Sequence, residues 1–268
     1  MAGQPAAGAK IAVRHLHKTF TLRGGQKVVA LQDVDFDIAD GEFVSVIGAS
    51  GCGKTTLLRI IGGFEQADQG CVDIASTPSA SGLVTSTVFQ EESVFPWLTA
   101  EENIGYGLKI RKVPRARREE IVTHFIDKVG LSAFRNAYPA QLSGGMRQRV
   151  SVARAFANDP QVLLMDEPFG ALDEQTRLVL QGEILRLWNE HRRTVVFVTH
   201  NLDEAITLSD RIVVLGARPG RVKAVITVGI PRPRNVIALR GNLRYGQLYQ
   251  QLWNLLQGDI AAAPASAA

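Results

Sequence analysis

Short stretches with the spacing of β-strands recur along the whole chain. Residues 11–20, 28–31 and 34–38 alternate apolar and polar positions, which is typical of strands that bury one face. Glycine pairs and Asp-Gly steps, at residues 24–25 and 40–41, predict turns between them. Residues 43–47 and 162–165 are apolar runs of the kind that form buried strands. Further strands are predicted near residues 71–74, 84–89, 194–199, 212–215 and 222–228.

Between these strands the apolar positions follow the period of helices. The change is clearest over residues 99–158, where Ile121, Phe125 and Val129 are spaced by four. A helix is also predicted around Leu180, Ile184 and Leu187, whose spacing gives it one buried face. The last predicted helix covers about residues 242–257, with leucines at positions 243, 248, 252, 255 and 256. Strands and helices in this order predict an α/β protein.

Composition narrows the class of protein without naming a function. The chain has 268 residues, of which 46% are hydrophobic and 21% charged, and its net charge is +4. This length suits one large domain or a domain with an inserted subdomain, and the charge is too small to indicate nucleic acid by itself. Two cysteines do not make a disulfide framework, and no run approaches the ~20 apolar residues of a membrane-spanning helix. We therefore expect a reducing cytoplasm, with a disordered lead at residues 1–9 and an Ala/Pro tail at the C-terminus.

A glycine-rich loop between a predicted strand and a predicted helix is the first candidate binding site. It matches G-x-x-x-x-G-K-[ST], and in this strand–loop–helix context the match predicts a phosphate-binding P-loop. Backbone N–H groups of such a loop point at phosphate oxygens, and the helix N-terminus adds a positive dipole end. The lysine would meet the β- and γ-phosphates, and the first threonine hydroxyl would ligate Mg²⁺. The P-loop (residues 48–56) consists of Gly48, Ala49, Ser50, Gly51, Cys52, Gly53, Lys54, Thr55 and Thr56.

Polar residues at the ends of two other predicted strands are candidates for metal binding and for catalysis of hydrolysis. Asp166 and Glu167 end the apolar run 162–165, where open α/β sheets bind their ligands. Successive side chains of an extended backbone diverge, so Asp166 can hold Mg²⁺ while Glu167 polarises the attacking water. His200 ends the strand at 194–199, a position that favours a role at the γ-phosphate over a structural one. Asn201 and Glu204 resemble a helix cap.

Three further positions are candidates for contacts with a nucleotide. Gln90 closes the strand near 84–89, and its amide can ligate a metal. Phe20 ends the first strand, where it could stack on an adenine ring or be a core aromatic. Residues 142–149 form a serine-glycine turn before a helix, which predicts a second anion site. One nucleotide does not need two such loops in one chain, so each loop is expected to act on the ATP of a different subunit.

Cys52 and a basic run have open interpretations. If Cys52 is accessible beside the phosphates, the free protein should be sensitive to thiol alkylation and ATP should protect it. Basic residues between positions 109 and 118 could bind nucleic acid or anionic lipid, or form a solvated helix face. No aromatic residues are interleaved with them, which favours the solvated face. They are Lys109, Arg111, Lys112, Arg115, Arg117 and Arg118.

Together these segments resemble the ATP-binding subunit of an ABC transporter, from about residue 11 to residue 228. Phe20 matches the family's adenine-stacking position, and the P-loop is its Walker A motif. Gln90 matches the Q-loop. Residues 142–149 match the signature motif, here called the signature loop.

The same resemblance covers the second half of the chain. Residues 162–167 match the Walker B motif, residues 171–173 match the D-loop, and His200 matches the switch histidine. Residues 95–99, 170–177 and 217–221 are similar to the nitrate/sulfonate/taurine branch of bacterial importers. In Met146 and in Phe20 the chain departs from the commoner glutamine and tyrosine of the wider family.

The resemblance implies a RecA-like P-loop core over residues 10–230, with an antiparallel β subdomain and an inserted α-helical subdomain at about 91–159. Residues 231–268 would be a C-terminal extension without an assigned function. Two subunits would sandwich two ATP molecules, with Ser143, Gly144 and Gly145 reaching the partner's ATP.

The implied role is to power a membrane permease, served by a substrate-binding protein, from the cytoplasmic face of the inner membrane. The implied cargo is nitrate, a sulfonate, taurine or a related small anion. The alternative is a non-transport ABC ATPase that acts on nucleic acid or ribosomes. The chain has no second cassette and no long coiled-coil insertion, which favours transport. A simple P-loop kinase would have no use for the signature loop.

Overall fold

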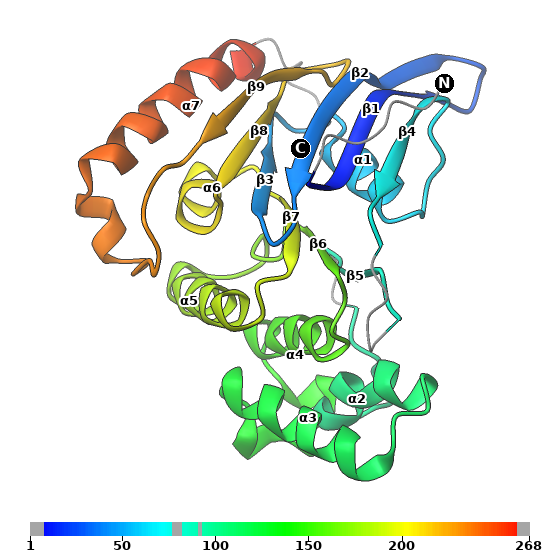
Figure 1. The fold of residues 1–268 in the computed structure, drawn as a ribbon, viewed down its shortest axis with the longest axis vertical. Coiled ribbons are helices and arrows are strands. Elements are labelled where there is room, and N and C mark those ends of the chain that lie inside the picture. Colours follow the sequence, from blue (N-terminus) through cyan, green and yellow to red (C-terminus); the bar gives the residue numbers. More distant parts are fainter. Residues whose placement is uncertain (1–7, 77–81, 91–92, 262–268) are drawn as a thin grey trace. The chain divides into compact units, whose positions relative to one another are not determined.

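The computed structural model describes residues 8–76, 82–90 and 93–261, in two compact units (Figure 1). Unit 1 comprises residues 1–77 and 194–268, and unit 2 comprises residues 78–193. Three sequence predictions fall wholly or partly outside the described residues: the lead at 1–7, the start of the helical insert at 91–92, and the tail at 262–268.

An antiparallel sheet forms one part of unit 1. β1 (Ala9–Thr21) lies between β2 (Lys27–Ala39) and β4 (Gln69–Ile74). Gly24 and Gly25, with φ of 103° and 83°, make the predicted turn between β1 and β2. The predicted stretches 28–31 and 34–38 are a single strand, because Asp33 adopts a φ of 52° and the pairing with β1 shifts around it.

Parallel strands form the other part of unit 1. β3 (Phe43–Ile47) is completely buried and pairs in parallel with β7 (Thr194–Val198) and with β8 (Arg211–Leu215). β9 (Val222–Thr227) adds an antiparallel strand beside β8. Apolar side chains cover both faces of β3 because helices pack there, as in other parallel sheets.

The C-terminal extension belongs to the core of unit 1. The helices of this unit are α1 (Lys54–Ile61), α6 (Leu202–Leu208), the 3₁₀ turn η3 (Ala238–Gly241) and α7 (Leu243–Ala261). Leu248, Leu252 and Leu256 of α7 are buried in one cluster with Ile206 of α6 and Ile212 of β8. The tyrosine hydroxyl of Tyr245 also donates a hydrogen bond to Asp203. The predicted helix at 242–257 is confirmed, and it packs on the domain as a structural part of it.

Unit 2 combines two parallel strands with helices. β5 (Thr85–Val88) pairs in parallel with β6 (Val162–Asp166). The longer helices of unit 2 are α2 (Ala100–Ile110), α3 (Arg115–Lys128), α4 (Gly144–Ala157) and α5 (Glu174–His191). Two short 3₁₀ turns are η1 (Ser132–Phe134) and η2 (Pro139–Gln141). α2 packs against both α3 and α4 (Figure 1). This compact unit also contains β5, β6 and α5, so it is larger than a helical insert at 91–159, whose borders stay a prediction.

Local capping explains where α2 begins. Thr99 accepts a hydrogen bond from the backbone of Glu102, and the Glu102 carboxylate accepts one from the backbone of Thr99. This capping box satisfies two N–H groups that a helix start leaves open.

None of the described helices is both long and apolar enough to cross a membrane.

Candidate nucleotide site

The P-loop connects β3 to α1 in unit 1. Gly51 and Gly53 have φ of 73° and 96°, a left-handed conformation that glycine adopts without strain. The ammonium group of Lys54 donates hydrogen bonds to the carbonyl oxygens of Gly48 at 2.9 Å and Ala49 at 3.1 Å. The lysine therefore closes the loop at the start of α1, and helix N-termini are sites that attract anions.

Glycine is required at Gly48 and Gly53 because neighbouring backbone atoms leave no room for a side chain. A Cβ at Gly48 would lie 2.5 Å from the sulfur of Cys52, and one at Gly53 would lie 2.7 Å from the carbonyl oxygen of Ala30. At Gly51 the nearest atom would be an Nη of Arg218 at 2.6 Å, which a flexible side chain can withdraw, so there the φ of 73° is what favours glycine. The packing thus keeps the loop tight enough for its N–H groups to converge on an anion, which fits a nucleotide phosphate.

His200 follows the strand next to the P-loop strand. Because β3 and β7 run in parallel, the P-loop and His200 leave the sheet at the same edge. Asn201 then caps α6, and its side-chain oxygen accepts hydrogen bonds from the backbone N–H groups of Asp203 and Glu204. The predicted cap is confirmed at Asn201, while the carboxylate of Glu204 accepts a hydrogen bond from the hydroxyl of Thr199.

Phe20 is not a core aromatic. It lies near the end of β1, opposite Val28, and its ring is only partly buried. The ammonium of Lys18 sits 5.1 Å from the ring centre. A partly exposed ring of this kind has a face to offer to a ligand.

Unit 2 brings Gln90, Asp166 and Glu167 to one edge of its strand pair. Val88 of β5 lies opposite Met165 of β6, so Gln90 and Asp166 both follow the carboxyl ends of parallel strands. Asp166 is only 4% exposed. Glu167, directly after it, has a φ of 42°, which is strained for a residue other than glycine. Such strain is concentrated at functional sites.

The signature loop leads into α4. Ser143 is the N-cap residue of α4, and its hydroxyl accepts a hydrogen bond from the backbone of Met146 at 3.2 Å. A Cβ at Gly145 would lie 2.5 Å from a methyl carbon of Thr176 on α5. Asp173 caps α5 through that same Thr176, with hydrogen bonds of 3.0 Å and 2.7 Å to its backbone and hydroxyl. These bonds lower the pKa of Asp173. The sequence analysis did not predict this cap, although Asp is one of the residues preferred at helix N-caps.

The predicted site residues therefore form two sets. Unit 1 holds Phe20, the P-loop and His200, and unit 2 holds Gln90, Asp166, Glu167 and the signature loop.

Cys52 is buried within the P-loop. Its side chain is 1% exposed, and burial raises the pKa of its thiol. The accessibility on which the alkylation prediction depended is absent.

Comparison with known proteins decides the family. Residues 31–170 match the family described as ABC transporter. An uncharacterized ABC transporter ATP-binding protein of Methanocaldococcus jannaschii is 44% identical over 94% of this chain and 92% of its own length. The chain belongs to the ABC transporter family.

Other relatives carry names that refer to import. The taurine import ATP-binding protein TauB of Roseobacter denitrificans is 42% identical over 79% of this chain and 80% of its own length. The nitrate import ATP-binding protein NrtC of Synechococcus elongatus is 42% identical over 92% of this chain, which spans 38% of that protein.

Solved structures agree with the fold. The dimeric post-hydrolysis structure of the ATP-binding cassette MJ0796, bound to ADP and Pi, is 32% identical. The match covers 82% of this chain and 100% of the MJ0796 chain, with a TM-score of 0.71. The chain is an ABC-type ATPase that binds ATP, and the predicted α/β P-loop fold with an antiparallel sheet is confirmed.

Proposed function

We propose that this ATPase powers an importer for nitrate, a sulfonate, taurine or a related small anion. The observation that carries the proposal is the P-loop closed by Lys54, in a chain whose relatives include nitrate and taurine import proteins. Hydrolysis of ATP would supply the free energy for uptake through a permease. As the ATP-binding subunit it would bind at the cytoplasmic face of the inner membrane, and a substrate-binding protein would deliver the anion.

The P-loop and Phe20 are the proposed contacts for ATP. Backbone N–H groups of residues 48–56 and the ammonium of Lys54 would hold the phosphates, and the ring of Phe20 would stack on adenine. Two of the three N–H groups of the Lys54 ammonium donate to the loop carbonyls, so the ammonium would give up at least one of these bonds to meet both the β- and γ-phosphates.

Three oxygen donors are the proposed ligands of Mg²⁺. They are the hydroxyl of Thr55, the amide oxygen of Gln90 and the carboxylate of Asp166, a set of hard ligands that suits this ion. Asp166 is buried at the carboxyl end of β6, the end at which open α/β sheets bind their ligands, which fits this role. When bound, Mg²⁺ neutralises charge on the phosphates.

Glu167 and His200 are the proposed groups at the reacting end. Glu167 would accept a proton from the attacking water, and its strained backbone would fix the direction of its carboxylate. His200, at the edge of the sheet beside the P-loop, would hydrogen-bond the γ-phosphate.

The proposed assembly is a dimer of two copies around two ATP molecules. Each signature loop would offer Ser143, Gly144 and Gly145 at the N-terminus of α4 to the partner's ATP. The dimeric form of the solved cassette supports this arrangement.

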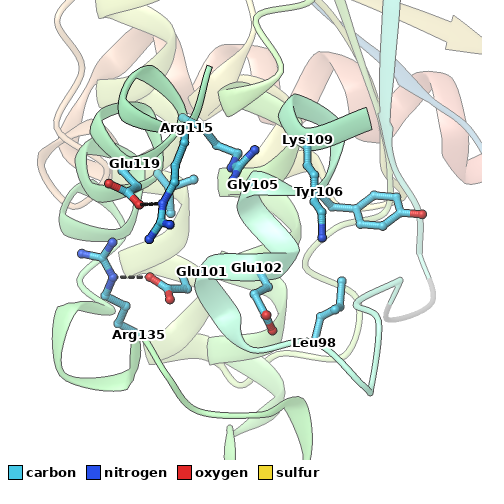
Figure 2. Close-up of a pocket in the computed structure, with 11 residues that line it drawn as sticks. Leu98, Glu101, Glu102, Gly105, Tyr106, Lys109, Arg115, Glu119 and Arg135 are labelled. Atoms are coloured by element: carbon cyan, nitrogen blue, oxygen red, sulfur yellow. Dashed lines mark hydrogen bonds and ion pairs between the residues drawn. The ribbon is translucent and has the colours of Figure 1, made fainter. Parts of the chain in front are cut away.

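An exposed aromatic cluster is the proposed surface for the permease. Phe95 lies 5.6 Å from Trp97 and 4.6 Å from Tyr106, measured between ring centres, and Trp97 is 69% exposed. Beside Tyr106, α2 and α3 enclose a hollow of about 400 Å³. Ion pairs between Arg115 and Glu119 and between Arg135 and Glu101 lie in its wall (Figure 2). Aromatic residues beside charged groups suit a protein partner with an apolar tip.

Two residues of the basic run form ion pairs within their own helix. Arg115 and Arg117 pair with Glu119 and Glu120 along α3, at distances of 2.7 Å and 2.6 Å. Intrahelical pairs of this kind belong to a solvated helix face and favour transport over a role on nucleic acid.

The test is affinity purification of tagged Glu167→Gln protein, with ATP, from detergent-solubilised cells. Recovery of a multi-spanning permease, identified by mass spectrometry, supports the proposal and narrows the cargo. Recovery of ribosomal proteins or nucleic acid instead would overturn it.

A further inference from the structure

The turn between β8 and β9 lies directly against the P-loop. We call residues 216–221 the β8–β9 turn. Arg218 in this turn donates a hydrogen bond from Nε to the carbonyl oxygen of Gly51, at 3.4 Å. Its guanidinium also fills the space that a side chain at Gly51 would take. The exposed Arg218 therefore touches the P-loop where the backbone is left-handed.

The backbone of the turn is fixed to β2. Gly220 donates a hydrogen bond to the carbonyl of Ala30 at 3.0 Å and accepts one from the backbone of Gln32 at 2.9 Å. A Cβ at Gly220 would lie 2.2 Å from the carbonyl oxygen of Cys52, so only glycine lets the turn approach this closely. Contacts at Gly220 thus bring the turn and the P-loop together independently of Arg218.

The C-terminal helix holds the other side of the turn. The carboxylate of Asp259 on α7 accepts hydrogen bonds from the backbone N–H of Ala217 at 3.1 Å and from the ammonium of Lys223 at 2.6 Å. Ala217 is the residue before Arg218. Because Leu248 and Leu252 anchor α7 in the core, Asp259 is held in place by a packed element.

We propose that Arg218 is a positioning residue for the nucleotide, and that α7 sets its position through Asp259. A hydrogen bond to the Gly51 carbonyl holds this peptide unit in place, and with it the neighbouring N–H groups that would bind a phosphate. The positive charge of the guanidinium adds to the attraction for the triphosphate. Arg218 thus strengthens nucleotide binding and leaves the hydrolytic step unchanged. This inference rests on the assignment of the P-loop to the phosphates of ATP.

The first test compares Arg218→Ala with Arg221→Ala. Arg221 lies in the same turn and its guanidinium bonds to Gln32 of β2, so its removal changes the charge equally without touching the P-loop. We expect Arg218→Ala to raise the Kd and KM for ATP by about 3- to 10-fold, because the substitution removes one hydrogen bond to the P-loop. The kcat should stay within twofold of the wild type, and Arg221→Ala should change neither value. Equal effects of the two substitutions on the Kd would overturn the proposal.

The second test addresses α7. Asp259→Ala should also raise the Kd for ATP, and combining it with Arg218→Ala should add little, because both act on the same turn. Lys223→Met removes the other partner of Asp259 but leaves the bond to Ala217, so its Kd for ATP should be that of the wild type. Fully additive effects of Asp259→Ala and Arg218→Ala would exclude coupling through the turn. Thermal unfolding of each variant shows whether α7 remains docked.

Lys54→Ala separates this inference from the assignment of the site. If Lys54→Ala leaves nucleotide affinity unchanged, the assignment of the P-loop to ATP is wrong. If Lys54→Ala abolishes binding while Arg218→Ala matches Arg221→Ala, only the role of Arg218 is wrong.

Discussion

Glu167 combines a carboxylate with a backbone conformation that costs free energy. Its φ of 42° follows directly on the buried Asp166, and its carbonyl accepts a hydrogen bond from the backbone of Gly170 at 3.1 Å. A left-handed non-glycine residue costs of order 1–3 kcal/mol, and the surrounding structure must offset this. Strain at a carboxylate that follows a buried strand end fits the catalytic role proposed for Glu167.

Substitution of Glu167 by glutamine should separate binding from hydrolysis. Glu167→Gln keeps the shape and hydrogen-bonding capacity of the side chain but cannot accept a proton. We expect ATP affinity to be retained and the hydrolysis rate to fall by roughly 10²–10⁴-fold, the usual contribution of a general base. Steady-state phosphate release and nucleotide-binding titrations measure both quantities. Near-normal turnover would refute the assignment.

The thiol of Cys52 should be slow to react in the folded protein. Burial leaves it 1% exposed and raises its pKa, so both access and the thiolate fraction are low. We expect an alkylating reagent at pH 7.5 to label Cys71, which is partly exposed, before Cys52, with no effect of ATP on the order. Peptide mapping by mass spectrometry gives the order, and unfolded protein, in which both thiols react, is the control. Rapid labelling of Cys52 that ATP blocks would instead restore the interpretation that the sequence suggested.

At the scale of elements, the sequence predicts the strands and helices whose apolar positions follow a clear pattern. β3, β6 and β7 are apolar runs and were located to within one residue of their ends, because strands buried on both faces have few polar positions. β2 was predicted as two strands because polar Gln32 and Asp33 interrupt the pattern, whereas the structure accommodates them in a bulge. The stripe of α7 predicts a buried face, but periodicity does not say which surface covers it.

Glu183 on α5 makes stability depend on pH. Burial raises its pKa from 4.5 to about 7, although the guanidinium of Arg149 lies 3.4 Å away and opposes the shift. Between these pKa values the folded protein binds more protons than the unfolded chain, so stability falls as the pH rises from about 4.5 to about 7.

Glu183→Gln should therefore stabilise unit 2 at pH 8 and have little effect at pH 4.5. With allowance for solvent around the carboxylate, we expect about 1 kcal/mol, or a Tm increase of about 2–4 °C. Thermal unfolding of wild type and variant across this pH range is the measurement. Glu190→Gln, on the same helix, is the matched control. Its carboxylate pairs with Lys128, which lowers its pKa, so the variant should be destabilised at pH 8. An equal gain for Glu183→Gln at both pH values would contradict the linkage.

At the scale of the whole molecule, the residues proposed to act on ATP are divided between the two units. The P-loop and His200 belong to unit 1, and Gln90 and Glu167 belong to unit 2. These positions could be predicted because each follows a strand, and strand ends are visible in the sequence. The β8–β9 turn could not be connected to the P-loop in this way. More than 160 residues separate Gly51 from Arg218, and they become neighbours through the parallel pairing of β3 with β8 and the contacts of Gly220 with β2. Contacts that depend on strand order rather than on local pattern are out of reach of a single sequence.

The aromatic cluster of unit 2 gives a test of the role of the molecule in transport. Trp97 is exposed and contacts Phe95 just before α2. Because its side chain is not part of the buried core, its removal leaves that core intact. If the cluster docks on a permease, Trp97→Ala should lose about 2 kcal/mol of binding, typical of a central aromatic anchor, and reduce co-purification of the permease about 30-fold.

The isolated Trp97→Ala protein should still hydrolyse ATP at the wild-type rate, because the residue belongs to neither set of nucleotide residues. Uptake of the anion into cells or vesicles should fall in parallel with permease binding. Phe134→Ala removes another exposed aromatic residue of unit 2, outside the cluster, and should change neither binding nor uptake. Loss of ATP hydrolysis by isolated Trp97→Ala protein, or uptake equal to that of Phe134→Ala, would show that this surface does not transmit the work of ATP hydrolysis to a membrane partner.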